Sequence, residues 1–263
     1  MDRILHELIS IMNETDKDET YHNLARILVE NIDKIKNMSI TQLADLCYVS
    51  SATISRFCRE LGFQNFSAFK TALEGSYGFE VDYNNEYKDS HVSIKDKINY
   101  LQNETLDSLK SINNAINIDD LLELVKTIHD TKNIVFFSQS HYQFLALYLQ
   151  QRLALFKKII YIDVEQRRQI SRAEQMDENS LAIIYSPRGQ SFTFSRVSSL
   201  LSKNKTKTIL ITQNNLISNK SRYDKVINIG GTSENNLGLI SYLYFIDQLI
   251  LIYYTLYVNE LIV

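Results

Sequence analysis

Residues 39–69 read SITQLADLCYVSSATISRFCRELGFQNFSAF, and this stretch decides the fold of the first part of the chain. Apolar side chains recur in it at the spacing of amphipathic helices, and they are Ile40, Leu43, Ala44, Val49, Ile54, Phe57, Cys58 and Leu61. A break of about four residues at 47–50 has the length that sets two helices at a steep angle in a helix-turn-helix. The stretch therefore predicts two short helices joined by a tight turn.

The second helix of this pair is expected to present small, hydroxylated and basic side chains. Ser50 or Ser51 can cap its first turn. The side chains predicted to contact DNA are Ser51, Ala52, Thr53, Ser55, Arg56 and Arg59. Small side chains let a helix approach a groove closely, while hydroxyl and guanidinium groups reach phosphates and base edges. We therefore expect sequence-specific binding of a double-stranded DNA operator, although a generic helical hairpin has the same periodicity.

Within this stretch the order of residues is more particular than the periodicity. Residues 43–44 are LA, residues 49–50 are VS and residues 53–57 are TISRF. The pattern ends with LGF at residues 61–63 and a phenylalanine at residue 66. This pattern closely resembles the amino-terminal domain of the RpiR (MurR/RpiR) family of bacterial transcription regulators. The resemblance implies a following sugar isomerase (SIS) domain that senses a phosphorylated sugar, and control of sugar metabolism genes. Tyr48 departs from it, because helix-turn-helix proteins usually place glycine where the turn needs a positive φ.

Composition excludes several other classes of protein. With 263 residues, 44% of them hydrophobic and 22% charged, the chain can form one large or two ordinary globular domains. Its net charge of −3 argues against binding nucleic acid through bulk positive charge. Residues 34–70 nevertheless hold five basic and two acidic side chains, which fits a small DNA-contacting face.

Neither a cofactor nor a membrane span is expected. The two cysteines, Cys47 and Cys58, form no Cys-x-x-Cys pair, so we expect reduced, buried thiols in a cytoplasmic protein without metal. No secretory signal is recognised at the start. Residues 237–257 are long enough to span a membrane, but Asp247 lies near their middle, where a carboxylate costs roughly 2.5–3.5 kcal/mol. We expect this helix to lie in a core or a subunit interface.

The fold class expected is α/β: an all-α helix-turn-helix domain followed by an α/β domain with a mostly parallel sheet. Residues 1–74 are assigned to the DNA-binding domain, 75–92 to a linker, and 93–263 to a SIS-like domain for effector binding and dimerisation. Five short apolar runs in the third segment predict strands buried on both faces, at 133–138, 158–163, 180–186, 206–212 and 225–230. Ligands in such sheets bind beyond the carboxyl ends of the strands.

The resemblance implies phosphosugar binding by two loops of the SIS domain. The first is usually Gly-x-Gly-x-Ser, and this chain has Ser-Gln-Ser-His-Tyr at 138–142; the second resembles Ser-x-Ser-Gly-x-Thr and reads Ser-Pro-Arg-Gly-Gln-Ser at 186–191. The predicted effector-binding residues are Ser138, Ser140, Ser186, Arg188, Gly189 and Ser191. Asn214 and Ser218, with Thr212, make a weaker third element.

Two other functions stay open at the level of sequence. The SIS domain has lost both glycines of the first loop, so it could serve only to join copies of the chain as a homodimer or homotetramer. A sugar-phosphate isomerase is the second alternative. No Glu or His in the two loops, His141 included, has an evident acid–base partner, so we expect no catalytic residue and no enzyme activity.

Overall fold

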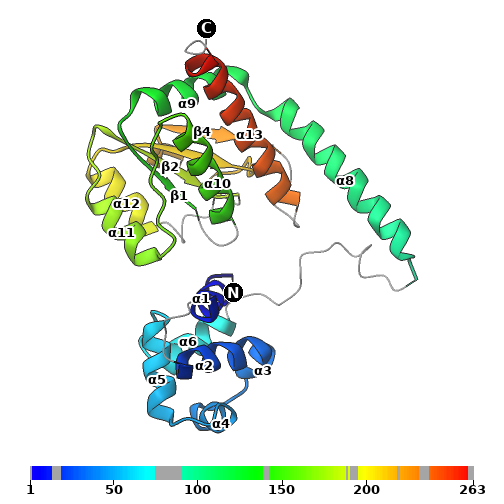
Figure 1. The fold of residues 1–263 in the computed structure, drawn as a ribbon, viewed down its shortest axis with the longest axis vertical. Helices are drawn as coiled ribbons and strands as arrows, with labels where there is room; N and C mark the ends of the chain where they lie inside the picture. The colour runs from blue at the N-terminus through cyan, green and yellow to red at the C-terminus, as the bar shows by residue number, and fades with distance from the viewer. Residues whose placement is uncertain are drawn as a thin grey trace. The chain divides into compact units, whose positions relative to one another are not determined.

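The protein divides into two compact units, Met1–Val81 and Asp82–Val263. The computed structural model describes residues 2–13, 19–74, 91–138, 142–187, 189, 195–217, 220–230 and 237–259. Figure 1 shows an all-helical N-terminal unit and a C-terminal unit built around a sheet. The stretch assigned to a linker, 75–92, lies almost wholly outside the described residues.

The N-terminal unit consists of short helices around one apolar core. Its helices are α1 (Asp2–Asn13), α2 (Glu19–Glu30), α3 (Ile32–Ile35), α4 (Ile40–Leu46), α5 (Ser51–Glu60) and α6 (Phe66–Glu74). The pair predicted from residues 39–69 is α4 and α5. All of its apolar positions on α5 and just beyond, Ile54, Phe57, Cys58 and Leu61, are buried in this core. Tyr21 of α2 packs edge-on against Phe57 with ring centroids 5.2 Å apart.

The C-terminal unit is a three-layer α/β/α fold. Its elements are α8 (Ile94–Ala115), α9 (Ile118–Asp130), β1 (Asn133–Phe137), α10 (Tyr142–Leu155), α11 (Gln166–Glu174), β2 (Ser180–Tyr185), α12 (Ser195–Lys203), β3 (Lys207–Thr212), a 3₁₀ turn η1 (Lys220–Arg222), β4 (Lys225–Asn228) and α13 (Leu237–Tyr257). The strands are all parallel and lie in the order β1-β2-β3-β4. The α/β fold with a parallel sheet is thus confirmed.

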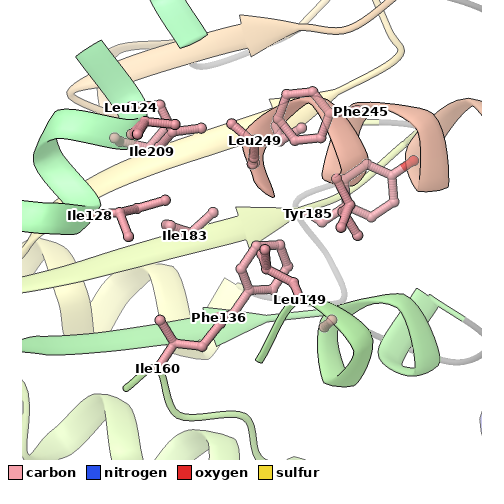
Figure 2. Packing of buried hydrophobic residues seen from close by; sticks show 14 of the residues in the cluster. Leu124, Ile128, Phe136, Leu149, Ile160, Ile183, Tyr185, Ile209, Phe245 and Leu249 are labelled. Carbon is pink, nitrogen blue, oxygen red and sulfur yellow. The ribbon is translucent and has the colours of Figure 1, made fainter. Parts of the chain in front are cut away.

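Successive side chains of each strand point to opposite faces of the sheet. One face packs against α9, α10 and α13, and the other against α11 and α12. Figure 2 shows the first of these layers, where Phe136, Ile183 and Ile209 from three neighbouring strands meet Leu149 and Leu249 from the helices. Because both faces are covered, the strands are continuously apolar, which is the property that revealed them in the sequence.

One predicted strand was wrong. Residues 158–163 form a single bridge, Tyr161 to Val135, on the edge of β1 opposite β2. Two backbone hydrogen bonds of 2.8 Å hold it, from the Phe136 amide to the Tyr161 carbonyl and from the Tyr161 amide to the Ile134 carbonyl. Within the described residues the segment has a neighbouring strand on one side only, which is β1. Arg172 of α11 also holds the segment, through a 2.8 Å ion pair with Asp163. Apolar content alone does not distinguish such an edge segment from a strand.

The helical segment that precedes α4 is divided into α2 and α3 at Asn31, whose φ of −125° and ψ of 17° leave the helical region. The Asn31 side chain donates to the Ile27 carbonyl over 2.9 Å, so the amide competes with the helix ladder at the break.

Helix α13 is the longest apolar helix of the C-terminal unit. Among the described residues it is the one helix long and apolar enough to cross a membrane, and 39% of its most apolar window is buried. Its inward face lies in the core against the sheet, through Tyr242, Phe245, Ile246, Leu249, Ile250 and Tyr253. Ser241 lies 2.8 Å, hydroxyl to hydroxyl, from Ser108 of α8. The expectation of a helix buried in a core holds for this face.

Candidate DNA-binding and effector sites

The turn between α4 and α5 is fixed by hydrogen bonds at both ends. Ser39 and Gln42 form a reciprocal capping box at the start of α4. At its end the Val49 amide donates to the Ala44 carbonyl over 3.0 Å and the Tyr48 amide to the Asp45 carbonyl over 3.2 Å, which is a Schellman motif. Tyr48 holds the left-handed position of that motif with φ +55°, as its place in the turn predicted.

Ser50, and not Ser51, is the residue that caps helix α5. The Ser50 hydroxyl accepts from the Thr53 amide over 3.1 Å and lies 2.9 Å from the Thr53 hydroxyl. Thr53 is therefore partly engaged in capping its own helix. Ala52, Arg56 and Arg59 are exposed, and the apolar side chains between them, Ile54, Phe57 and Cys58, are buried.

The six residues predicted to contact DNA thus lie on the outer side of one helix. Ser51, Thr53 and Ser55 are half-buried on the flanks of the exposed stripe of Ala52, Arg56 and Arg59. The Arg59 Nε donates to the Ser55 carbonyl over 3.3 Å, so this guanidinium lies along the helix. Lys70 contributes to the fold instead, because its ammonium donates to the Met38 carbonyl over 3.1 Å. Arg56 is consequently the basic side chain best placed to reach a partner from α5.

The predicted effector loops lie at the carboxyl edge of the sheet, where the direction of chain winding reverses. From β1 the chain passes to Tyr161 on one edge of β1 and then to β2 on the other. Ligands of open α/β sheets bind at such a reversal. Ser138 follows β1 and Ser186 follows β2, so adjacent strands bring them to the same edge. Ser140, Arg188 and Ser191, with His141 and Ser218, lie outside the described residues.

Two glutamines that sequence inspection missed hold the loop after β1. The Ser138 carbonyl accepts from the Gln143 amide over 3.3 Å and from the Gln169 amide over 3.0 Å. The same amides donate to the Val164 and Asp163 carbonyls over 2.8 Å. Helices α10 and α11 therefore both hold Ser138, the residue that follows β1. No local pattern marks these glutamines, because they act across 5 and 31 residues of sequence.

The loops after β2 and β3 are joined to each other. The Gly189 amide donates to the Ser186 carbonyl over 2.9 Å, which closes a turn, and Gly189 has φ +62°. A Cβ at this position would meet only the terminal methyl of the Ile217 side chain, which can turn aside, so it is the left-handed conformation that favours glycine here. The Thr212 hydroxyl donates to the Pro187 carbonyl over 3.1 Å. Ser186, Gly189 and Thr212 thus belong to one rigid edge.

Three tyrosines line the inner side of this edge. The rings of Tyr185 and Tyr242 stack with centroids 3.5 Å apart, and Tyr142 meets Tyr185 edge-on at 4.9 Å. The Tyr185 hydroxyl donates to the Gln213 side-chain oxygen over 3.2 Å. Burial raises the pKa of both Tyr185 and Tyr242 well above the usual range, so both hydroxyls stay protonated. Tyr142, at the family's serine position, joins this aromatic cluster.

Several buried polar atoms at this edge have no hydrogen-bond partner in the part of the chain that the structure describes. They are Ser138 Oγ, Gln143 Oε1, Gln169 Oε1, Gln213 Nε2 and the Tyr242 hydroxyl. A buried polar atom without a partner costs about 1–3 kcal/mol, which a polar ligand can recover by bonding to it. Among the described residues no group of three His, Cys, Asp or Glu side chains could hold a metal ion.

Known protein families match both parts of the chain. Residues 4–79 match the helix-turn-helix domain of the RpiR family, and residues 127–256 match the SIS domain. The chain belongs to the RpiR family. In this RpiR protein the matched regions contain α1–α6 and the whole of the sheet. The family predicted from residues 43–66 is therefore confirmed.

Curated relatives of this RpiR protein are transcriptional regulators of the helix-turn-helix type. One from Providencia stuartii is 24% identical over 224 residues, which cover 81% of this chain and 75% of the relative. Another, from Haemophilus influenzae, is 23% identical over 138 residues, or 51% of this chain and 47% of the relative. The chain thus matches between half and three quarters of the length of these regulators.

Solved structures share the fold at low identity. The NanR protein of Vibrio vulnificus, complexed with ManNAc-6P, aligns with a TM-score of 0.56 and 20% identity, over 97% of this RpiR protein and 92% of NanR. The sugar isomerase domain of an RpiR transcription factor from Sphaerobacter thermophilus aligns with a TM-score of 0.53 and 11% identity, over 61% and 90% of the two chains. A putative sugar-phosphate isomerase from Listeria monocytogenes aligns at 0.56 and 14%, over 64% and 93%.

Proposed function

We propose that this RpiR-family protein is a cytoplasmic transcriptional regulator that binds operators of sugar metabolism genes as a homodimer or homotetramer. Helix α5 enters the major groove, with Arg56 and Arg59 contacting phosphates or bases and Ser51, Ala52, Thr53 and Ser55 near base edges. A phosphorylated sugar bound at the carboxyl edge of the sheet changes the affinity for the operator. The protein has no enzyme activity of its own.

The observation that carries the DNA-binding part is the exposed face of α5. Its first turn is capped by Ser50 and leads into exposed Ala52 and Arg56, with no bulky side chain between them on that face. This surface suits the close approach that reading a groove requires. The kinship with helix-turn-helix transcriptional regulators supports the same role.

The effector part rests on the carboxyl edge of the sheet and on its relatives. Among the described residues, buried polar atoms of Ser138, Gln143 and Gln169 have no hydrogen-bond partner at the strand-order reversal, and Gly189 holds a left-handed turn after β2. NanR, which shares the fold over nearly the whole chain, was solved with ManNAc-6P. We infer that Ser138, Ser140, Ser186, Arg188, Gly189 and Ser191 form the ligand site.

Arg56→Ala tests the DNA-binding assignment. Duplexes that the unmodified protein selects from a random pool serve as the operator, and affinity is measured by fluorescence anisotropy. Losing one base or phosphate contact of about 1–3 kcal/mol lowers affinity roughly 5- to 150-fold. Arg26→Ala is the matched control, because Arg26 is an exposed arginine of α2 paired with Glu30. Unchanged affinity of the Arg56 variant would remove α5 from the interface.

A thermal-shift screen tests the effector assignment. The panel contains hexose 6-phosphates, N-acetylhexosamine 6-phosphates including ManNAc-6P, the unphosphorylated sugars, and inorganic phosphate. A ligand at one hundred times its Kd stabilises the folded protein by about 2.7 kcal/mol, and Gly189→Ala should abolish the shift. If no phosphosugar shifts the melting temperature, the C-terminal unit serves to join copies only. Turnover of a phosphosugar in the same samples would instead favour an isomerase.

A further inference from the structure

Helix α8 has a covered half and an uncovered half (Figure 1). Its second half packs on α13, where Ser108 and Ile112 are buried. In its first half the apolar side chains face outward within the described part of the chain, and their exposed fractions are 78% for Ile94, 60% for Ile98, 47% for Leu106 and 37% for Leu101. This first half projects from the sheet and the other helices of the C-terminal unit.

Apart from Leu106, the covered and uncovered side chains named above belong to one stripe. Along α8 the stripe advances by alternate steps of four and three residues, which is the spacing of a coiled-coil seam. Its members are Ile94, Ile98, Leu101, Thr105, Ser108 and Ile112. The face that α13 covers in the second half of α8 therefore continues uncovered through the first half.

A helix segment of this kind needs a partner. From Ile94 to Leu106 it has about 13 residues and spans roughly 20 Å, and an apolar stripe of this length is stabilised when a second helix covers it. We propose that the first half of α8 pairs antiparallel with the same segment of a second copy of the chain. The proposal rests on the proposed function in one respect, that helix-turn-helix regulators bind paired half-sites as paired copies.

The charges of α8 favour this occupant and this direction. Lys95, Asp96 and Lys97 lie near its start, where Asp96 is engaged with the capping Ser93, and Glu104, which accepts from the Tyr100 hydroxyl, and Asp107 lie two to three turns later. Antiparallel pairing centred between Ile98 and Leu101 sets Ile98 against Leu101 of the second copy. The two-fold symmetry then places Lys97 beside Glu104 of the other copy twice. Parallel pairing would instead gather the lysines of both copies at one end.

Sedimentation of the full chain across a range of concentrations tests the surface. We expect the unmodified protein to be dimeric, and Leu101→Glu to raise its dissociation constant about 100-fold, because two apolar contacts are lost by symmetry. Asn103→Glu puts the same charge on the opposite face of α8, and Leu251→Glu puts it on the exposed face of α13; neither should change assembly. A dimeric Leu101 variant overturns the proposal, as does an unmodified protein that stays monomeric because its own chain covers α8.

Charge reversal tests the direction. Lys97→Glu and Glu104→Lys should each weaken the dimer about tenfold, since each creates two like-charge pairs. The double variant restores opposite charges and should assemble like the unmodified protein. Additive weakening in the double variant would rule out the antiparallel register.

Binding to an operator with two half-sites separates this proposal from the proposed function. If the α8 surface and the regulator assignment are both correct, the Leu101→Glu variant is monomeric, loses affinity for the paired site and keeps its affinity for a single half-site. If the variant is monomeric but even the unmodified dimer selects no DNA, the surface stands and the regulator assignment fails. If the variant stays dimeric and binds the operator, the surface fails and the regulator assignment stands.

Discussion

Tyr48 shows at the scale of one residue how this chain ends its helices. Helices α4, α5, α10 and α12 end in Schellman motifs whose left-handed positions are held by Tyr48, Gly62, Lys157 and Lys205. A side chain in this conformation costs roughly 1–2 kcal/mol relative to glycine. Only Gly62 avoids that cost, in a chain with seven glycines. The remaining three positions are local strain that the surrounding packing overcomes.

Replacing Tyr48 with glycine should therefore stabilise the N-terminal unit. Its side chain is 93% exposed, so no packing is lost, and relief of the left-handed strain should add about 1 kcal/mol to the free energy of unfolding after the extra chain entropy of glycine is subtracted. Urea unfolding followed by circular dichroism measures the change. Gly62→Ala, at φ +84°, is the converse control and should destabilise. A less stable Tyr48→Gly variant would mean that the exposed ring makes a contact of its own.

The two thiols are a second case in which one residue's surroundings decide its chemistry. Burial raises the pKa of Cys47 to about 11 and that of Cys58 to about 12. The raised pKa values mean that the folded state favours the protonated thiols. The contribution of these thiols to the free energy of unfolding is therefore complete below the unfolded pKa near 9, and it is lost as pH rises through about 11 and 12.

Thiol titration at pH 8 should follow from this burial. We expect the native protein to react slowly with an aromatic disulfide reagent and the urea-unfolded chain to react promptly at both cysteines, because only a thiolate attacks. Absorbance of the released thiolate measures both rates. Fast reaction of the native protein would show that the core of α4 and α5 opens readily.

At the scale of elements, α11 is tied to the first effector loop by a single side chain. The Gln169 amide donates to the Ser138 and Asp163 carbonyls, so one residue joins the helix, the loop and the edge segment. Gln169→Leu keeps the volume and removes both donors. We expect a loss of about 1–3 kcal/mol in the free energy of unfolding and loss of the thermal shift with phosphosugar.

Calorimetry of this variant gives both quantities. Gln150→Leu is a suitable control, because Gln150 donates to the Ile160 carbonyl from α10 and is remote from Ser138 in the chain. Equal phosphosugar affinity in the Gln169 variant and the unmodified protein would separate α11 from the ligand site.

The elements that could be predicted from the sequence are those determined by neighbouring residues in the chain. Helix α5 was specified by its apolar spacing, with only the choice between Ser50 and Ser51 as its cap left open, and β1, β2, β3 and β4 by runs that are apolar because both faces are covered. Residues 158–163 have the same apolar content but lie at an edge with one neighbour, which depends on the strand order and not on the run itself. The glutamine contacts to Ser138 and the stacking of Tyr185 on Tyr242 also depend on the strand order and were not predictable.

At the scale of the whole molecule, α13 connects two features of the C-terminal unit through consecutive residues. Ser241 bonds to Ser108 of α8, the helix by which the chain enters this unit, and Tyr242 stacks on Tyr185 at the candidate effector edge. If the proposed ligand displaced Tyr242, it would act on the same helical turn that holds α8. We propose this turn as the route by which ligand binding alters α8.

Ser241→Ala should weaken the response to effector more than effector binding itself. The substitution leaves the buried Ser108 hydroxyl without its partner and should cost about 1–3 kcal/mol, whereas Ser108→Ala with Ser241→Ala removes both groups and should recover most of that stability. Operator affinity with and without phosphosugar measures the response. An unaltered response in both variants would exclude this route.

The adjacency of Ser241 and Tyr242 also has a consequence for what the protein senses in a cell. Coupling between two binding equilibria is reciprocal, so a sugar phosphate that lowers operator affinity by some factor must itself bind more weakly, by that same factor, to protein already on the operator. The concentration at which the sugar is detected would then differ between free and operator-bound molecules. Operator number would thus take part in setting the threshold of the response.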